Sequence, residues 1–89
     1  MERRYYGIVV VDETARPRGS RALVEFPEAP GCQTFVEPTE EVTEVAREAL
    51  QGWLEAHEEG GRELPEPSVT PPEVPEGAYL ISVAVEVPD

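Results

Sequence analysis

One stretch of this chain, residues 39–59, has the periodicity of an amphipathic helix, and it decides what the other segments must provide. At about 100° per residue, its apolar side chains fall on one stripe and its charged side chains fall opposite. The stripe must be buried against another layer, which we expect to be a sheet built by the rest of the chain. Its members are Val42, Val45, Ala46, Ala49, Leu50, Trp53 and Leu54.

Capping residues mark both ends of this helix. The hydroxyl of Thr39 can accept hydrogen bonds from the free amides of the first turn, and the glutamates that follow oppose the positive end of the helix dipole. Gly60 and Gly61 can take the left-handed conformation that commonly ends a helix. The sequence therefore predicts a helix from Thr39 to Glu59, about 20 residues long.

Three strand-like segments precede the helix. Tyr5–Asp12 is rich in aromatic and β-branched residues, which is typical of a central strand covered on both faces, or nearly so. Arg21–Phe26 alternates as a second strand, and Cys32–Glu37 predicts a short third strand. The short turns between them make all three antiparallel neighbours.

A proline-rich segment, 62–77, follows the helix and cannot continue it or lie inside a sheet. After it, 78–87 alternates as a final apolar strand. We expect an α+β fold of order β-β-β-α-β, in which a right-handed crossover places the fourth strand parallel to the first, in spatial order 3-2-1-4. The fourth strand would then be an apolar edge, which favours a dimer or tetramer paired through 78–87.

Charge narrows the class of partner. The chain has 19 Asp and Glu against seven Arg and no Lys, a net charge of −12, so its field repels phosphates and favours a basic partner over nucleic acid. The acidity is concentrated in residues 37–66. We interpret the charged helix face as a protein-binding surface, and its candidate contacts are Glu40, Glu44, Glu48 and Glu55. One alternative is that this face serves solubility alone. The proline-rich segment and the exposed edge strand are equally plausible contact points, and the sequence does not choose among them.

Several short motifs occur in a specific order. They are Phe26-Pro27, Pro30-Gly31-Cys32 followed by Thr34, the helix start Thr39-Glu40-Glu41, and Leu64-Pro65-Glu66-Pro67-Ser68. Each motif alone is weak evidence, but the ordered set resembles the HicB-type antitoxin family over nearly the whole chain. The resemblance implies a partial ribonuclease-H-like fold.

The resemblance also implies a function. Members of this family bind a small basic toxin that cleaves RNA, here a HicA-like ribonuclease, and mask its active surface without being enzymes themselves. Many carry a C-terminal DNA-binding module, which we do not expect in residues 1–89, because the last strand ends close to Asp89. The alternative is an interaction or assembly module of the same fold that has no toxin partner.

Two residues are candidates for chemistry. Cys32 as a nucleophile would need a base beside it, and His57 is the only histidine in the chain. We instead expect Cys32 to be a small structural residue where the third strand begins. We expect His57 to border the core near the helix C-terminus. We predict no catalytic residues, cofactor or metal site, because one His and one Cys without motif spacing are too few ligands.

Acidic residues on the predicted strands raise a second alternative, a metal-dependent nuclease. Asp12, Glu25 and Glu86 are the residues concerned, and adjacent first and fourth strands would let Asp12 approach Glu86. The acidic charge argues against this activity. A basic patch, Arg16, Arg18 and Arg21, is interpreted as a solvated hairpin loop.

Length and cysteine content set the remaining expectations. Eighty-nine residues predict one domain, 1–89, with a modest core. A single cysteine fits a reducing compartment, and no apolar run reaches the length of a membrane span. We therefore expect a cytoplasmic protein that does not bind membranes.

Overall fold

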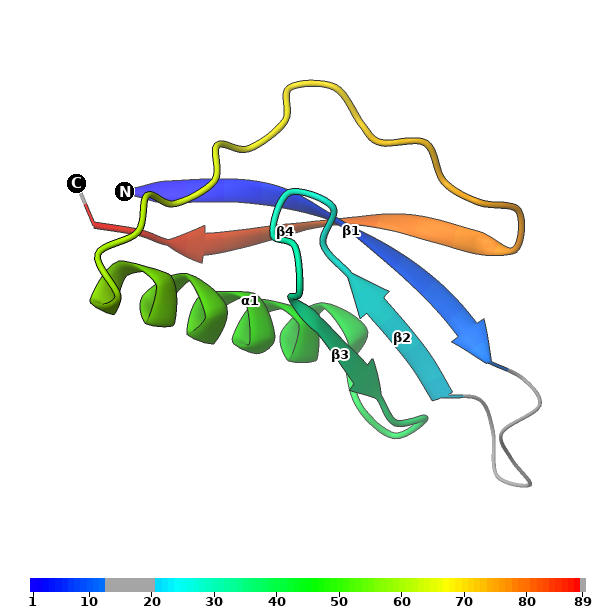
Figure 1. The fold of residues 1–89 in the computed structure, drawn as a ribbon. Helices are drawn as coiled ribbons and strands as arrows, with labels where there is room; N and C mark the ends of the chain where they lie inside the picture. The colour runs from blue at the N-terminus through cyan, green and yellow to red at the C-terminus, as the bar shows by residue number, and fades with distance from the viewer. Residues whose placement is uncertain (13–20, 89) are drawn as a thin grey trace.

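A computed structural model describes residues 1–12 and 21–88, and in it one helix covers one face of a four-stranded sheet (Figure 1). The elements are β1 (Glu2–Asp12), β2 (Arg21–Glu25), β3 (Gln33–Val36), α1 (Val42–Glu59) and β4 (Ala78–Glu86). The sheet order is β3-β2-β1-β4. The predicted α+β class, the element order and the spatial order of the strands are confirmed.

The predicted direction of the fourth strand is wrong. β4 runs antiparallel to β1, with Glu2 opposite Glu86 and Val10 opposite Ala78, so every pair in the sheet is antiparallel. Figure 1 shows the reason: the segment after α1 runs along the length of the sheet before β4 begins. An extended proline-rich chain spans about 3.1 Å per residue, so residues 61–77 are long enough to reach the far end of the sheet. The parallel fourth strand expected of a partial ribonuclease-H-like fold is therefore not found in residues 1–12 and 21–88.

The helix begins three residues later than its sequence signals predict. Glu41 occupies the N-cap position, and its carbonyl accepts the first helical hydrogen bond from the amide of Val45 at 3.1 Å. Thr39 instead lies in a turn, where the amide of Glu40 donates to the carbonyl of Glu37 at 2.9 Å. The predicted capping role of Thr39 is therefore wrong, whereas the C-terminal end at Gly60 is confirmed.

The core lies between α1 and the face of the sheet that it covers. Ala46, Leu50 and Leu54 are the buried helix residues, and they belong to the predicted stripe. Each fully buried leucine contributes about 1.5–3 kcal/mol, so this short stripe supplies much of the attachment between the two layers. The sheet contributes the alternate residues Tyr5, Val9, Ala22, Val24, Val36, Val83 and Val85.

The opposite face of the sheet is only partly covered. Tyr6 and Ile8 are half-buried, Val10 is 41% exposed, and Phe35 on β3 is 55% exposed. The prediction that the first strand is covered on both faces, or nearly so, is therefore wrong at Val10. The ring of Phe35 is shielded in part by Arg21, whose guanidinium carbon lies 5.3 Å from the ring centroid.

One carboxylate ties the proline-rich segment to the sheet. Glu28, in the turn after β2, accepts a hydrogen bond from the amide of Tyr6 at 3.1 Å and another from the amide of Ser68. The Tyr5 hydroxyl donates to the carbonyl of Pro65 at 2.6 Å. The segment is thus fastened at its start by contacts to β1 and to this turn.

Candidate partner-binding surface

The carboxylates predicted to bind a partner occupy two different places. Glu44, Glu48 and Glu55 are exposed residues of α1. Glu40 precedes the helix, and its carboxylate accepts a hydrogen bond from the amide of Glu37 at 2.9 Å. The first three therefore belong to the acidic face of the helix, whereas Glu40 closes the turn before it.

Few of the helix carboxylates are neutralised within the chain. Arg47 pairs with Glu44 at 2.7 Å, and in residues 1–12 and 21–88 this is the one ion pair that involves a carboxylate of α1. Glu48, Glu55, Glu58 and Glu59 are exposed and form no ion pair in that part of the chain. Electrostatic self-repulsion among them is thus available to be relieved by a basic partner.

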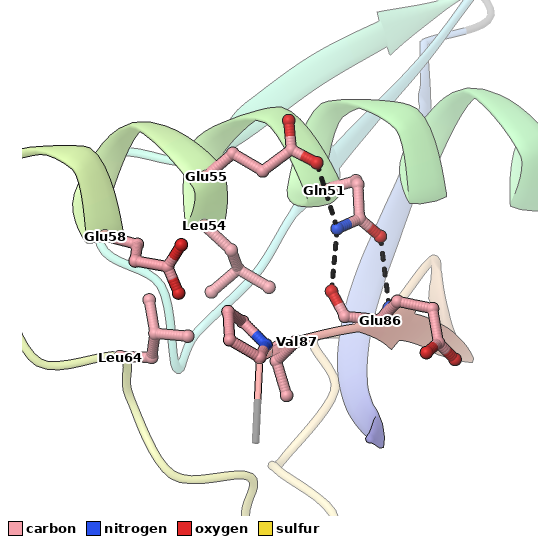
Figure 2. A pocket seen from close by; sticks show the side chains of 8 residues that line it. Gln51, Leu54, Glu55, Glu58, Leu64, Glu86 and Val87 are labelled. Atoms are coloured by element: carbon pink, nitrogen blue, oxygen red, sulfur yellow. Dashed lines mark hydrogen bonds between the residues drawn. The ribbon is translucent and has the colours of Figure 1, made fainter.

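A groove lies between α1 and the C-terminal end of β4 (Figure 2). Leu54, Leu64 and Val87 form its apolar part. Its acidic side chains, Glu55 and Glu58, come from α1. Glu86 of β4 lies at the groove, but its carboxylate points away from it (Figure 2) and is 3.7 Å from the N-terminal nitrogen. An apolar floor with carboxylates around it suits the aliphatic stem and charged end of an arginine or lysine side chain.

The side-chain amide of Gln51 closes one side of this groove. Its Nε2 donates to the carbonyl of Glu86 at 2.8 Å, and its Oε1 accepts from the amide of Glu86 at 3.1 Å (Figure 2). Gln51 therefore satisfies both backbone groups that one residue presents at the sheet edge. The sequence interpretation missed this role, because Gln51 falls among the charged residues on the polar side of the helix.

Cys32 is built into the core. It is 6% exposed, and its Sγ lies 3.9 Å from the carbonyl oxygen of Ala49 in α1. Burial raises the pKa of the Cys32 thiol to about 11, so the nucleophilic thiolate is scarce at neutral pH. The expected structural position of Cys32, just before β3, is confirmed.

His57 is stacked on an aromatic neighbour. Its ring centroid lies 3.8 Å from that of Trp53, with 23° between the ring planes, and both side chains are half-buried. Trp53 packs against the core, so His57 lies at the core boundary as predicted. Stacking on Trp53 fixes the imidazole as part of this packing.

Asp12 and Glu86, two of the acidic residues of the nuclease alternative, occupy strand positions that are far apart. Asp12 ends β1, where its backbone is opposite Arg21, whereas Glu86 is opposite Glu2 at the other end of the same strand. Ten residues of strand separate the two positions, which is about 33 Å. The expected approach of Asp12 to Glu86 is therefore wrong, and the cause is the antiparallel direction of β4. The residues that the structure describes contain no group of three or more His, Cys, Asp or Glu placed to hold a metal ion.

Two residues of the predicted basic patch, Arg16 and Arg18, lie outside the described residues. Arg21 is described and is bound within the fold. It pairs with Glu37 on the neighbouring strand end, with Nη2 and Oε2 2.9 Å apart. This ion pair links the start of β2 to the residue that follows β3.

Comparison with models of known families, with curated proteins and with solved structures gives no match. In the described part of the chain, no helix combines the length and the apolar character needed to cross a membrane.

Proposed function

We propose that this protein binds a small basic protein that cleaves RNA and masks its RNA-binding surface, as HicB-type antitoxins do. The ordered motifs described above support the proposal, and a cytoplasmic location fits it. The observation that carries it is the exposed row of unneutralised carboxylates on α1. A protein that binds RNA presents a cationic surface, and this row is a polyanion that can occupy the same surface.

The fold explains why these carboxylates can act together. Glu48 and Glu55 are two turns apart on one rigid helix, and the apolar stripe of that helix is fixed to the sheet by Leu50 and Leu54. A rigid array loses less conformational entropy on binding than a flexible acidic tail of the same charge would. Binding therefore does not require the helix to form or move.

The proposal predicts that a small basic protein that cleaves RNA is encoded beside this one, and the test is inhibition of that cleavage. We expect the two purified proteins to form a stable complex in which cleavage is lost, with affinity that falls steeply as salt concentration rises. Replacing Glu44, Glu48, Glu55 and Glu58 together by Gln should weaken inhibition at least tenfold. The matched control replaces Glu63, Glu66, Glu73 and Glu76 by Gln, which removes the same charge from the proline-rich segment.

Two results would end the proposal. One is that the basic protein encoded beside this one cleaves RNA equally well when this protein is present in excess. The other is equal loss of inhibition in both four-site variants, because net charge rather than the helix face would then be responsible.

A further inference from the structure

The outer edge of β4 has a defined set of outward-facing backbone groups. Met1 and Val87 exchange two hydrogen bonds, from the amide of Val87 at 2.8 Å and from the N-terminal nitrogen at 3.1 Å. In an antiparallel pair such bonded positions alternate with positions that face away. Given the register of β1 and β4, the amides and carbonyls of Leu80, Ser82 and Ala84 therefore point outward.

Both ends of this edge are closed by bonds within the chain. At one end the side-chain amide of Gln51 takes both backbone groups of Glu86. At the other end the amide of Ala78 donates to the carbonyl of Pro75 at 3.1 Å. The stretch Leu80–Ala84, which we call the open edge, lies between these closed ends, and in residues 1–12 and 21–88 no other segment pairs with it.

These closed ends disfavour pairing of β4 with a second copy of itself. A two-fold axis at Ser82 would set Ala78 of the second copy opposite Glu86, where Gln51 and the second copy's Pro75 already fill the gap. Shifting the axis to Leu80 or Ala84 brings one of the same closed positions into the ladder. A strand from another chain that covers only the open edge meets neither obstacle.

The acidic residues beside the open edge indicate which side chains such a strand should have. The open edge itself has no charged residue, but Glu55 lies beside Gln51, with Nε2 and Oε2 3.4 Å apart, and Glu58 lines the groove that follows. The chain of a partner that leaves the open edge at Ala84 enters this acidic groove. Basic side chains next to the strand are complementary to it.

Resting on the proposed function, we propose that the open edge binds a short basic strand of the partner as a fifth strand of the sheet, beside β4. Backbone hydrogen bonds to Leu80, Ser82 and Ala84 would hold the strand, and an adjacent arginine or lysine would enter the groove beside Leu54, Glu55 and Glu58. Recognition by backbone bonds explains how a strand of varied sequence can bind, and the carboxylates select for basic residues.

The test is an NMR titration of the isotope-labelled protein with the end-blocked peptide Arg-Val-Arg-Val-Arg and its acidic twin Glu-Val-Glu-Val-Glu. We expect saturable shifts at the amides of Leu80, Ser82 and Ala84 with the basic peptide only. Ser82→Pro removes one outward amide and should weaken binding at least tenfold, whereas Ser82→Ala should stay within about twofold, since it keeps the backbone group. If Ser82→Pro does not fold, slowed hydrogen exchange of the Ser82 and Ala84 amides on peptide addition to the natural protein decides instead.

Other outcomes separate this inference from the proposed function. Shifts confined to α1 would overturn binding at the open edge and leave the proposed function standing, and an absence of shifts would also overturn it. Concentration-dependent shifts of the same amides without peptide would show that a second copy occupies the open edge. Peptide binding at the open edge, without inhibition of RNA cleavage by the neighbouring basic protein, would uphold the inference and refute the proposed function.

Discussion

Gln51 and Glu86 join the helix to the edge of the sheet through two hydrogen bonds, 2.8 and 3.1 Å long, between one side-chain amide and one backbone residue. The amide of Gln51 thus takes the place of a neighbouring strand. This contact both stabilises the helix position and limits which part of β4 another chain can reach.

Replacing Gln51 by Ala should lower the free energy of unfolding by about 1–2 kcal/mol, because two backbone groups lose their partners. Urea denaturation measures this, and hydrogen exchange at the Glu86 amide should become faster. Glu48→Ala, an exposed change on the same helix, is the control. An unchanged exchange rate at Glu86 would contradict the contact.

The Glu28 carboxylate should contribute more to the free energy of unfolding than the other glutamates of strands and turns, because it accepts hydrogen bonds from the amides of both Tyr6 and Ser68. Glu28→Ala should lower the free energy of unfolding by about 1–3 kcal/mol and make residues 62–77 more sensitive to proteolysis. Glu25→Ala, at an exposed site, should do neither. Equal protease sensitivity of the two variants would argue against the bridge.

The Tyr5 hydroxyl should hold the proline-rich segment independently of Glu28. Tyr5→Phe keeps the buried ring and removes the 2.6 Å bond to Pro65, so we expect a loss of about 1 kcal/mol in urea denaturation. Tyr79→Phe is the matched control, because Tyr79 is 46% exposed. A double variant, Tyr5→Phe with Glu28→Ala, would show whether the two attachments act separately.

The buried thiol of Cys32 should make stability fall in alkaline solution. Because its pKa is raised to about 11 in the folded protein, its contribution is fully present below the unfolded pKa and is lost as pH rises through about 11. The difference in the free energy of unfolding between the natural protein and Cys32→Ala should therefore become smaller between about pH 9 and pH 11. At pH 8, alkylation should be roughly a hundredfold slower than for a free thiol, and equally fast alkylation would contradict the burial.

The sequence predicted the elements well because each has a periodicity of its own. The stripe that contains Leu50 and Leu54 marks the helix, and alternation marks β2 and β4. Alternation reads the same in both chain directions, so it does not distinguish a parallel fourth strand from an antiparallel one. Residues 61–77 are long enough to carry the chain to the far end of the sheet, so β4 begins there and runs antiparallel to β1. The crossover rule behind the prediction does not consider the length of this connection.

The binding surface was predictable only in part, for a related reason. An excess of glutamate on α1 is visible in the sequence, but Gln51 has the same place in the pattern as its solvated neighbours. Its role appears only when the helix is placed beside the end of β4. Glu28 is similar, since its two partners are distant in sequence and reach it through backbone amides.

The late position of β4 in the chain has a consequence for folding. β1 is paired along most of its length with residues that lie 68 to 84 positions further along the chain, from Val10 opposite Ala78 to Glu2 opposite Glu86. Contacts of such long sequence separation form slowly, so one edge of β1 stays unpaired while the helix and the proline-rich segment form. The interval before β4 docks is therefore when this acidic chain is most exposed to aggregation, and its strong net charge keeps such intermediates apart.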